Sequence, residues 1–86
     1  MKLDRNQGSD GLGKYALLNL RKNIIEWGRT EEEDEFFVIK LKDRHAKPAL
    51  LAYAKSIAPS NPEFASEIIN LANRAGTDSK WCKEPD

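Results

Sequence analysis

The chain has 86 residues, of which 40% are hydrophobic and 33% are charged, and its formal net charge is zero. This composition predicts one small domain with a single modest core. The balance of 14 basic and 14 acidic side chains argues against a general nucleic-acid coat or a polybasic membrane anchor. Uninterrupted apolar runs such as 36–39 are far below the roughly 18 residues that span a bilayer. We therefore expect neither membrane insertion nor secretion, and the N-terminus carries no signal-peptide core.

Residues with catalytic or metal-binding chemistry are few. Cys82 is the single cysteine, so an internal disulfide is excluded and a cytoplasmic location is expected. Cys82 and the single histidine, His45, are too few ligands for a zinc site. The place of Cys82 in a tail also disfavours a nucleophilic Cys–His pair. The glycine-rich stretch 8–13 lacks the lysine and serine or threonine with which a phosphate-binding loop ends. We expect no enzyme, no metal and no cofactor.

The N-terminal half predicts a flexible arm followed by a helix. Residues 1–13 have too few apolar side chains to repay ordering of the backbone. From Lys14 onward an apolar series has the three-four-three spacing of a helix, and Leu18 and Ile25 widen that face. The series consists of Leu17, Leu20, Ile24 and Trp27. Gly28 then predicts the end of the helix.

A second helix is predicted to begin at Thr30. Thr30 and Glu33 have the spacing of a capping box, which would place the acids of 31–34 beside the positive end of the helix dipole. The segment 36–42 is also rich in strand-forming residues, so a short strand there is the alternative. A continuous helical series favours the helix. Its members are Phe36, Ile39, Asp43, Ala46, Leu50, Tyr53 and Ile57.

Two further helices are predicted after a bend near Pro48. Proline lacks the N–H for an interior helical hydrogen bond, so the chain must kink there or restart with Asp43 as the cap. The alanine-rich segment 49–58 then predicts a helix that Pro59 ends. Ser60 and Glu63 form a second capping box, Pro62 lies in the first turn of the last helix, and Gly76 marks its end.

These elements predict an all-α fold, a small helical bundle with a C-terminal antiparallel helical hairpin; the alternative is an α+β fold with a short strand at 36–42. The predicted organisation is a flexible arm at 1–13, one helical domain at 14–76 and a tail at 77–86. Trp81 is too apolar to remain in water without a reason, so we expect it to dock on the bundle or on a neighbouring subunit.

Four stretches resemble small uncharacterised accessory proteins of tailed phages and prophages. They are KYALLNLR at 14–21, EFFVIKLKDRHAKPALLAYA at 35–54, PEFASEIINLANRAG at 62–76 and CKEPD at 82–86. The resemblance covers most of the chain and carries no catalytic residue across. It implies an accessory protein that acts in the bacterial host cytoplasm.

Two binding functions follow as hypotheses. The first is a non-enzymatic protein that binds a host or phage macromolecule, as an inhibitor of a host defence or DNA-binding protein, through acids and aromatic side chains. Its candidate residues are Glu31, Glu32, Glu33, Asp34, Glu35, Trp27, Tyr53 and Trp81. The alternative is a nucleotide or nucleic-acid module that holds phosphate with a basic cluster on one helical face. That cluster comprises Lys40, Arg44, His45 and Lys47.

The apolar inventory also predicts a homo-oligomer. The series of 17–27, the pair Phe36 and Phe37, and Trp81 exceed what one small bundle can bury. We expect the first helix at the interface between subunits, and substitution Ile25→Asp to favour the monomer.

Overall fold

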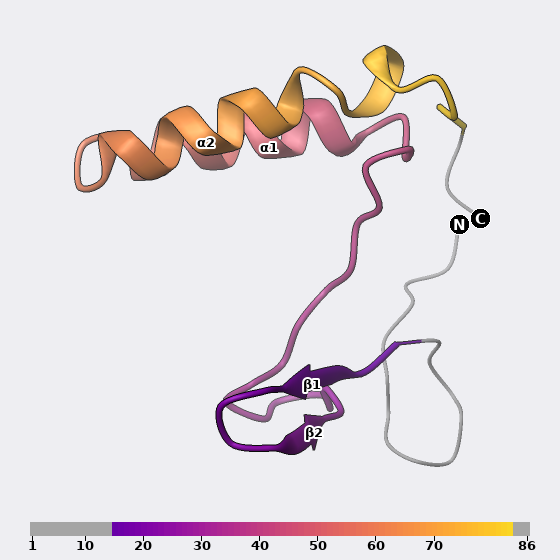
Figure 1. The fold of residues 1–86 in the computed structure, drawn as a ribbon, viewed down its shortest axis with the longest axis vertical. Helices are drawn as coiled ribbons and strands as arrows, with labels where there is room; N and C mark the ends of the chain where they lie inside the picture. The colour runs from indigo at the N-terminus through magenta and orange to yellow at the C-terminus, as the bar shows by residue number, and fades with distance from the viewer. Residues whose placement is uncertain (1–14, 84–86) are drawn as a thin grey trace. The chain divides into compact units, whose positions relative to one another are not determined.

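The computed structural model describes residues 15–83, which belong to two compact units, 15–38 and 39–83. Its elements in chain order are β1 (Leu17–Asn19), β2 (Ile24–Glu26), α1 (Ala46–Ile57), α2 (Pro62–Ala72) and the short 3-10 helix η1 (Gly76–Asp78) (Figure 1). The fold is mixed α+β, so the predicted all-α class is wrong. The alternative also misplaced its strand, because residues 35–40 have no regular secondary structure. The predicted arm at 1–13 lies outside the described residues, and the predicted domain limits remain a prediction.

The first unit is built on an antiparallel hairpin of β1 and β2, in which Leu18 lies opposite Ile25. Its turn is set by two asparagines. The Asn19 side-chain oxygen accepts hydrogen bonds from the N–H groups of Arg21 and Lys22 at 3.1 and 3.0 Å. Asn23 has a φ of 54°, a left-handed conformation that asparagine tolerates, and its N–H donates to the Asn19 carbonyl at 2.7 Å.

The predicted first helix is therefore wrong. Its apolar series spans two strands and the turn between them. That turn, 20–23, has four residues, about the number in one helical turn, so the apolar residues on either side of it have helical spacing. The asparagine side chains give the backbone a local alternative to helical hydrogen bonds. The paired aliphatic residues at 17–18 and 24–25 then suit short strands.

The predicted second helix is also absent. Residues 30–34 form turns, in which the Glu32 N–H donates to the Arg29 carbonyl at 3.2 Å. Glu31 has a φ of 66°, which lies outside the right-handed helical region, so no helix passes through it. Gly28 is buried beside the ring of Phe36. The turns of 30–34 therefore lie between two residues that are close in space.

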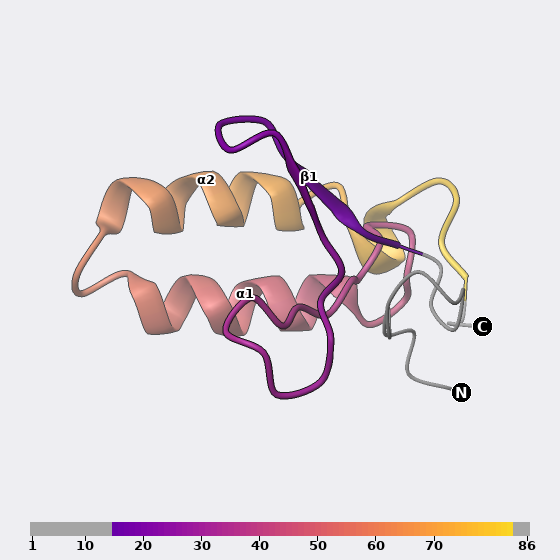
Figure 2. The ribbon, with the colours of Figure 1, turned by 90° about the horizontal axis from the view of Figure 1, so that it is seen from below.

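The second unit is an antiparallel hairpin in which α2 lies in front of α1 in Figure 1 and beside it in Figure 2. Both helices occur where the sequence predicted helices. Its buried apolar side chains are all alanines, which let the two backbones approach closely. They are Ala46, Ala54, Ala65, Ala72 and Ala75. The larger apolar residues lie around this narrow core and remain partly in solvent.

The open end of the helical hairpin is closed by backbone hydrogen bonds. Gly76 N–H donates to the Leu41 carbonyl at 2.7 Å, and Lys83 N–H donates to the Lys42 carbonyl at 2.9 Å. Arg44 N–H in turn donates to the Lys83 carbonyl at 2.9 Å. Residues 76–83 thus return to the segment that precedes α1. Trp81 is 67% exposed, so it does not dock on the bundle, and its docking on a neighbouring subunit stays a prediction.

The helix ends differ from the predicted caps by one to four residues. Asn61, not Ser60, caps α2, because its side chain accepts from the Phe64 N–H at 3.1 Å. Pro62 lies in the first turn as predicted. The end of α2 falls at Ala72, before the predicted Gly76. These corrections leave the hairpin itself in place.

Pro48 lies in the first turn of α1, which begins at Ala46 after the cap residue His45. Asp43 supports this start, since its side chain accepts from the His45 N–H at 2.8 Å. The chain thus restarts after Asp43, and no long helix runs through Pro48.

We expect Pro48→Ala to lower the free energy of unfolding by at most about 1 kcal/mol. A first-turn N–H has no helical acceptor, so alanine gains no bond there and makes the unfolded chain more flexible. Urea unfolding measures the change. As a contrast, Ala52→Pro, inside the same helix, should cost about 3 kcal/mol. A gain in stability for Pro48→Ala would contradict this placement of the helix start.

Candidate functional site

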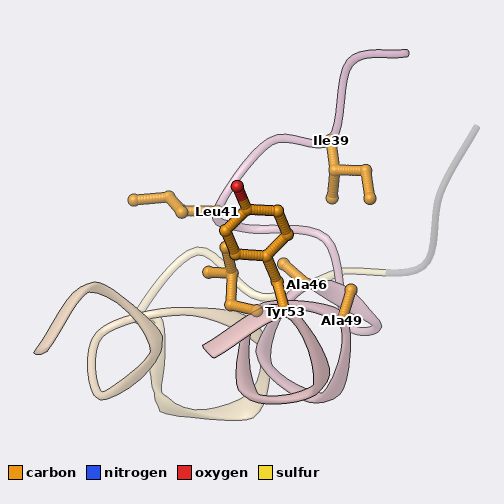
Figure 3. A pocket seen from close by; sticks show the side chains of 6 residues that line it. Ile39, Leu41, Ala46, Ala49 and Tyr53 are labelled. Atoms are coloured by element: carbon orange, nitrogen blue, oxygen red, sulfur yellow. The ribbon is translucent and has the colours of Figure 1, made fainter. Parts of the chain in front are cut away.

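The second unit contains a small apolar hollow on one side of α1 (Figure 3). It has a volume of about 200 Å³ and is lined by Ile39, Leu41, Ala46, Ala49, Leu50 and Tyr53. The segment 39–41 forms one side and α1 forms the other, with the Tyr53 ring between them. Ligand sites for small molecules usually hold about 300 Å³ or more and several polar groups. This hollow instead suits an apolar side chain of another macromolecule.

The apolar surface extends from the hollow onto α2. The rings of Tyr53 and Phe64 meet edge to face, with centroids 6.2 Å apart and an interplanar angle of 89°. Tyr53 is 50% exposed and Phe64 38% exposed, so the aromatic pair is only half covered. Aromatic pairs at the centre of a surface are common anchors for binding. The hollow and this aromatic pair are here called the hairpin face.

The acidic residues predicted to bind a partner lie together in the first unit. All five side chains of 31–35 are exposed in the turns after β2. The Glu31 N–H donates to a carboxylate oxygen of Glu35 at 3.2 Å, and Arg29 lies 3.9 Å from the Glu32 carboxylate. Because no helix begins here, the predicted stabilisation of these acids by a helix dipole is wrong. Their clustering has no capping role to explain it.

Exposed aliphatic side chains accompany this acidic turn within residues 15–38. Leu18 and Ile25, opposite one another on the strands, are 57% and 52% exposed. Further exposed members are Leu17, Leu20, Ile24 and Phe37, and Trp27 is half-buried. A two-stranded sheet with this much apolar surface normally needs a covering surface. We call the strands and residues 31–35 the acidic hairpin.

The basic residues predicted to bind phosphate do not share a helical face. Lys40 and Arg44 precede the start of α1, and His45 is its cap residue. Lys47 is in the first turn, where its ammonium forms an ion pair with Asp78 of η1. Lys40, Arg44 and His45 therefore lie outside the helix that contains Lys47. The predicted shared helical face is absent.

Trp81 and Cys82 are both exposed near the end of the described chain. The Lys80 ammonium lies 4.4 Å from the centroid of the Trp81 ring, and Cys82 is a free, exposed thiol. In the described part of the chain, three or more His, Cys, Asp or Glu side chains nowhere gather as a metal site would require.

Comparison with known proteins yields no match: none is found among family models, curated proteins or solved structures. Within residues 15–83, none of the helices has the length and apolar character needed to cross a membrane. The candidate surfaces therefore have to be interpreted from their own geometry.

Sequence reasoning missed the hairpin face as a unit. Of the residues of this face it named only Tyr53 as a candidate site residue. Ile39, Ala46 and Leu50 were placed in a helical apolar series, which normally means the core. The available signal was the number of small residues: a hairpin held together by alanines leaves its larger side chains at the rim. Spacing alone does not distinguish the core from that rim.

Proposed function

We propose that the protein acts without catalysis, by binding a basic partner protein through the acidic hairpin. The observation that carries this proposal is the combination of charge and apolar exposure within residues 15–38. That segment has three basic and six acidic side chains, a net charge of −3. Leu18 and Ile25 are exposed in the same unit as the five acids. Such a surface fits a partner with an apolar centre and a basic rim.

The chemical class of this partner follows from the acids. Closely spaced carboxylates attract surfaces that are rich in lysine and arginine, and proteins that bind nucleic acid have such surfaces. A bacterial DNA-binding or defence protein is therefore the partner class we propose, with the cytoplasm as the place of encounter. Binding there would compete with the phosphates of nucleic acid.

Capture from a bacterial lysate with the immobilised 86-residue chain tests the proposal. We expect a basic protein to be retained by the wild type and lost with Ile25→Asp and with Glu33→Lys. Glu63→Lys, the same charge change on α2, is the matched control and should retain it. The captured protein should also be released by added DNA. Equal capture by all four chains, or a captured protein with no basic surface, would contradict the proposal.

The alternative of phosphate binding by Lys40, Arg44, His45 and Lys47 has weaker support. Lys47 is paired with Asp78, and the remaining members do not share a helical face. Titration with single-stranded DNA at low and moderate salt separates the two functions. Salt-sensitive binding that Lys40→Ala or Arg44→Ala weakens would favour the alternative.

A further inference from the structure

The hairpin face is an apolar feature of residues 39–83 and does not belong to the acidic hairpin. Within those residues, no segment covers Tyr53 and Phe64, although together they form its aromatic centre. The hollow beside Tyr53 is open and lined by apolar side chains. Two helices alone form one layer, and such a layer is normally completed by a second one.

We propose that a second copy of this chain covers the hairpin face. The two α1–α2 hairpins pack face to face around a twofold axis as four helices, with Tyr53 and Phe64 of each copy at the centre. The hairpins run antiparallel, so the connection at 58–61 of each copy lies near the segment 39–45 of the other. The Tyr53 ring of each copy lies next to the hollow of its partner.

Charge complementarity supports both a second copy as the partner and the antiparallel orientation of the two hairpins. The open end of the hairpin carries Lys40, Lys42 and Arg44 against Asp43. The opposite end carries Glu63 and Glu67 on the first two turns of α2 against Lys55. An antiparallel pair places each acidic end beside a basic end, whereas a parallel pair places like charges together.

The size of the face sets the expected affinity. Helices of 12 and 11 residues are about 17 Å long and pack about 9 Å apart, which gives a face of roughly 300 Å² in projection. Two such faces give roughly 600 Å², below the about 1,200 Å² of standard specific interfaces, so we expect a weak dimer that dissociates in the micromolar range. The central aromatic pair should account for most of its stability.

Sedimentation of the full chain across the micromolar range tests the dimer. We expect a concentration-dependent dimer, and Tyr53→Glu should raise its dissociation constant by about tenfold or more, since a carboxylate would be buried at the centre. Leu51→Glu is the matched control, because Leu51 is 39% exposed and lies roughly 200° around α1 from Tyr53. It should leave the dimer unchanged. Circular dichroism verifies that each variant is folded, and Ala49→Glu, in the wall of the hollow, replaces Tyr53→Glu if that variant unfolds.

Glu67→Gln tests the direction of packing. In the antiparallel dimer it removes an attraction to the basic end and should weaken association about threefold. In a parallel dimer it would relieve repulsion between two acidic ends and tighten association. A tighter or unchanged dimer overturns the antiparallel arrangement. A compact monomer at high micromolar concentration, or a dimer that Tyr53→Glu and Ala49→Glu leave intact, overturns the proposal. The sequence placed Ile25 on a first helix at the subunit interface, but Ile25 lies on β2, so the expectation that Ile25→Asp favours the monomer is replaced. Ile25→Asp should abolish partner capture and leave this dimer unchanged, so the two proposals can fail separately.

Discussion

Replacement of Gly76 by alanine should lower the free energy of unfolding by about 3 kcal/mol, the largest loss expected from one methyl group in this chain. Gly76 has a φ of 59°, and an added Cβ would lie 3.0 Å from the Arg44 carbonyl oxygen and 3.0 Å from the Lys47 Cβ. The contact is with backbone and with the start of a side chain, so neither can move cheaply. The same shift would disturb the 2.7 Å hydrogen bond from Gly76 to Leu41.

Urea and thermal unfolding measure this loss, which corresponds to a decrease of roughly 12 to 24 °C in melting temperature for a domain of this size. Thr77→Ala, at the exposed neighbouring position, should change little. Gly76→Asn separates the two causes, since asparagine tolerates the left-handed backbone but still adds the Cβ. We expect asparagine to cost nearly as much as alanine. Recovery with asparagine would show that the close contact is unimportant.

The second large effect is expected for Gly28→Ala in the first unit. Gly28 has a φ of 65°, and its added Cβ would lie 2.5 Å from the nearest carbon of the Phe36 ring. The ring must leave its place, and the left-handed backbone adds about 1 kcal/mol or more of strain. A two-stranded hairpin is only marginally stable, so we expect residues 15–38 to lose their fold while α1 and α2 keep theirs.

Amide hydrogen exchange resolves this local effect. The Asn23 N–H, bonded to Asn19, should lose its protection in Gly28→Ala, whereas the Ala58 N–H, bonded to Ala54, should keep it. Phe36→Leu in the same chain should restore part of the protection, because the smaller side chain leaves room for the methyl group. Unchanged protection of Asn23 in the single variant would contradict the close packing of Gly28.

The two units differ in how far the sequence could predict them. In 46–72 the local signals agree: an alanine-rich segment, Pro59 after it and Pro62 in the next first turn all indicate helices. In 15–38 the apolar spacing indicated a helix, and the prediction rested on that spacing alone. The turn that Asn19 and Asn23 form was not part of it. The positive φ at Glu31 could not be predicted, since glutamate rarely adopts it.

The candidate sites show the same difference. The exposure of the acids at 31–35 could be predicted from their number, although their place in a turn could not. The ion pair between Lys47 and Asp78 joins residues 31 positions apart and depends on the return of the chain to α1. No spacing rule reaches across such a distance, so the basic cluster was taken for a single surface. Side-chain partners that are distant in the sequence had to come from the structure.

The alanines between α1 and α2 determine which substitutions the second unit can accept. An alanine has no carbon beyond Cβ to lose, so truncation of interior side chains can lower the stability of the unit only slightly. Enlargement is the opposite case, because valine at the fully buried Ala72 of α2 would have to push that helix away from its neighbour. A mutational scan that replaces each residue with alanine would leave these positions unchanged. Such a scan would detect losses of stability only at the larger residues around the alanine core.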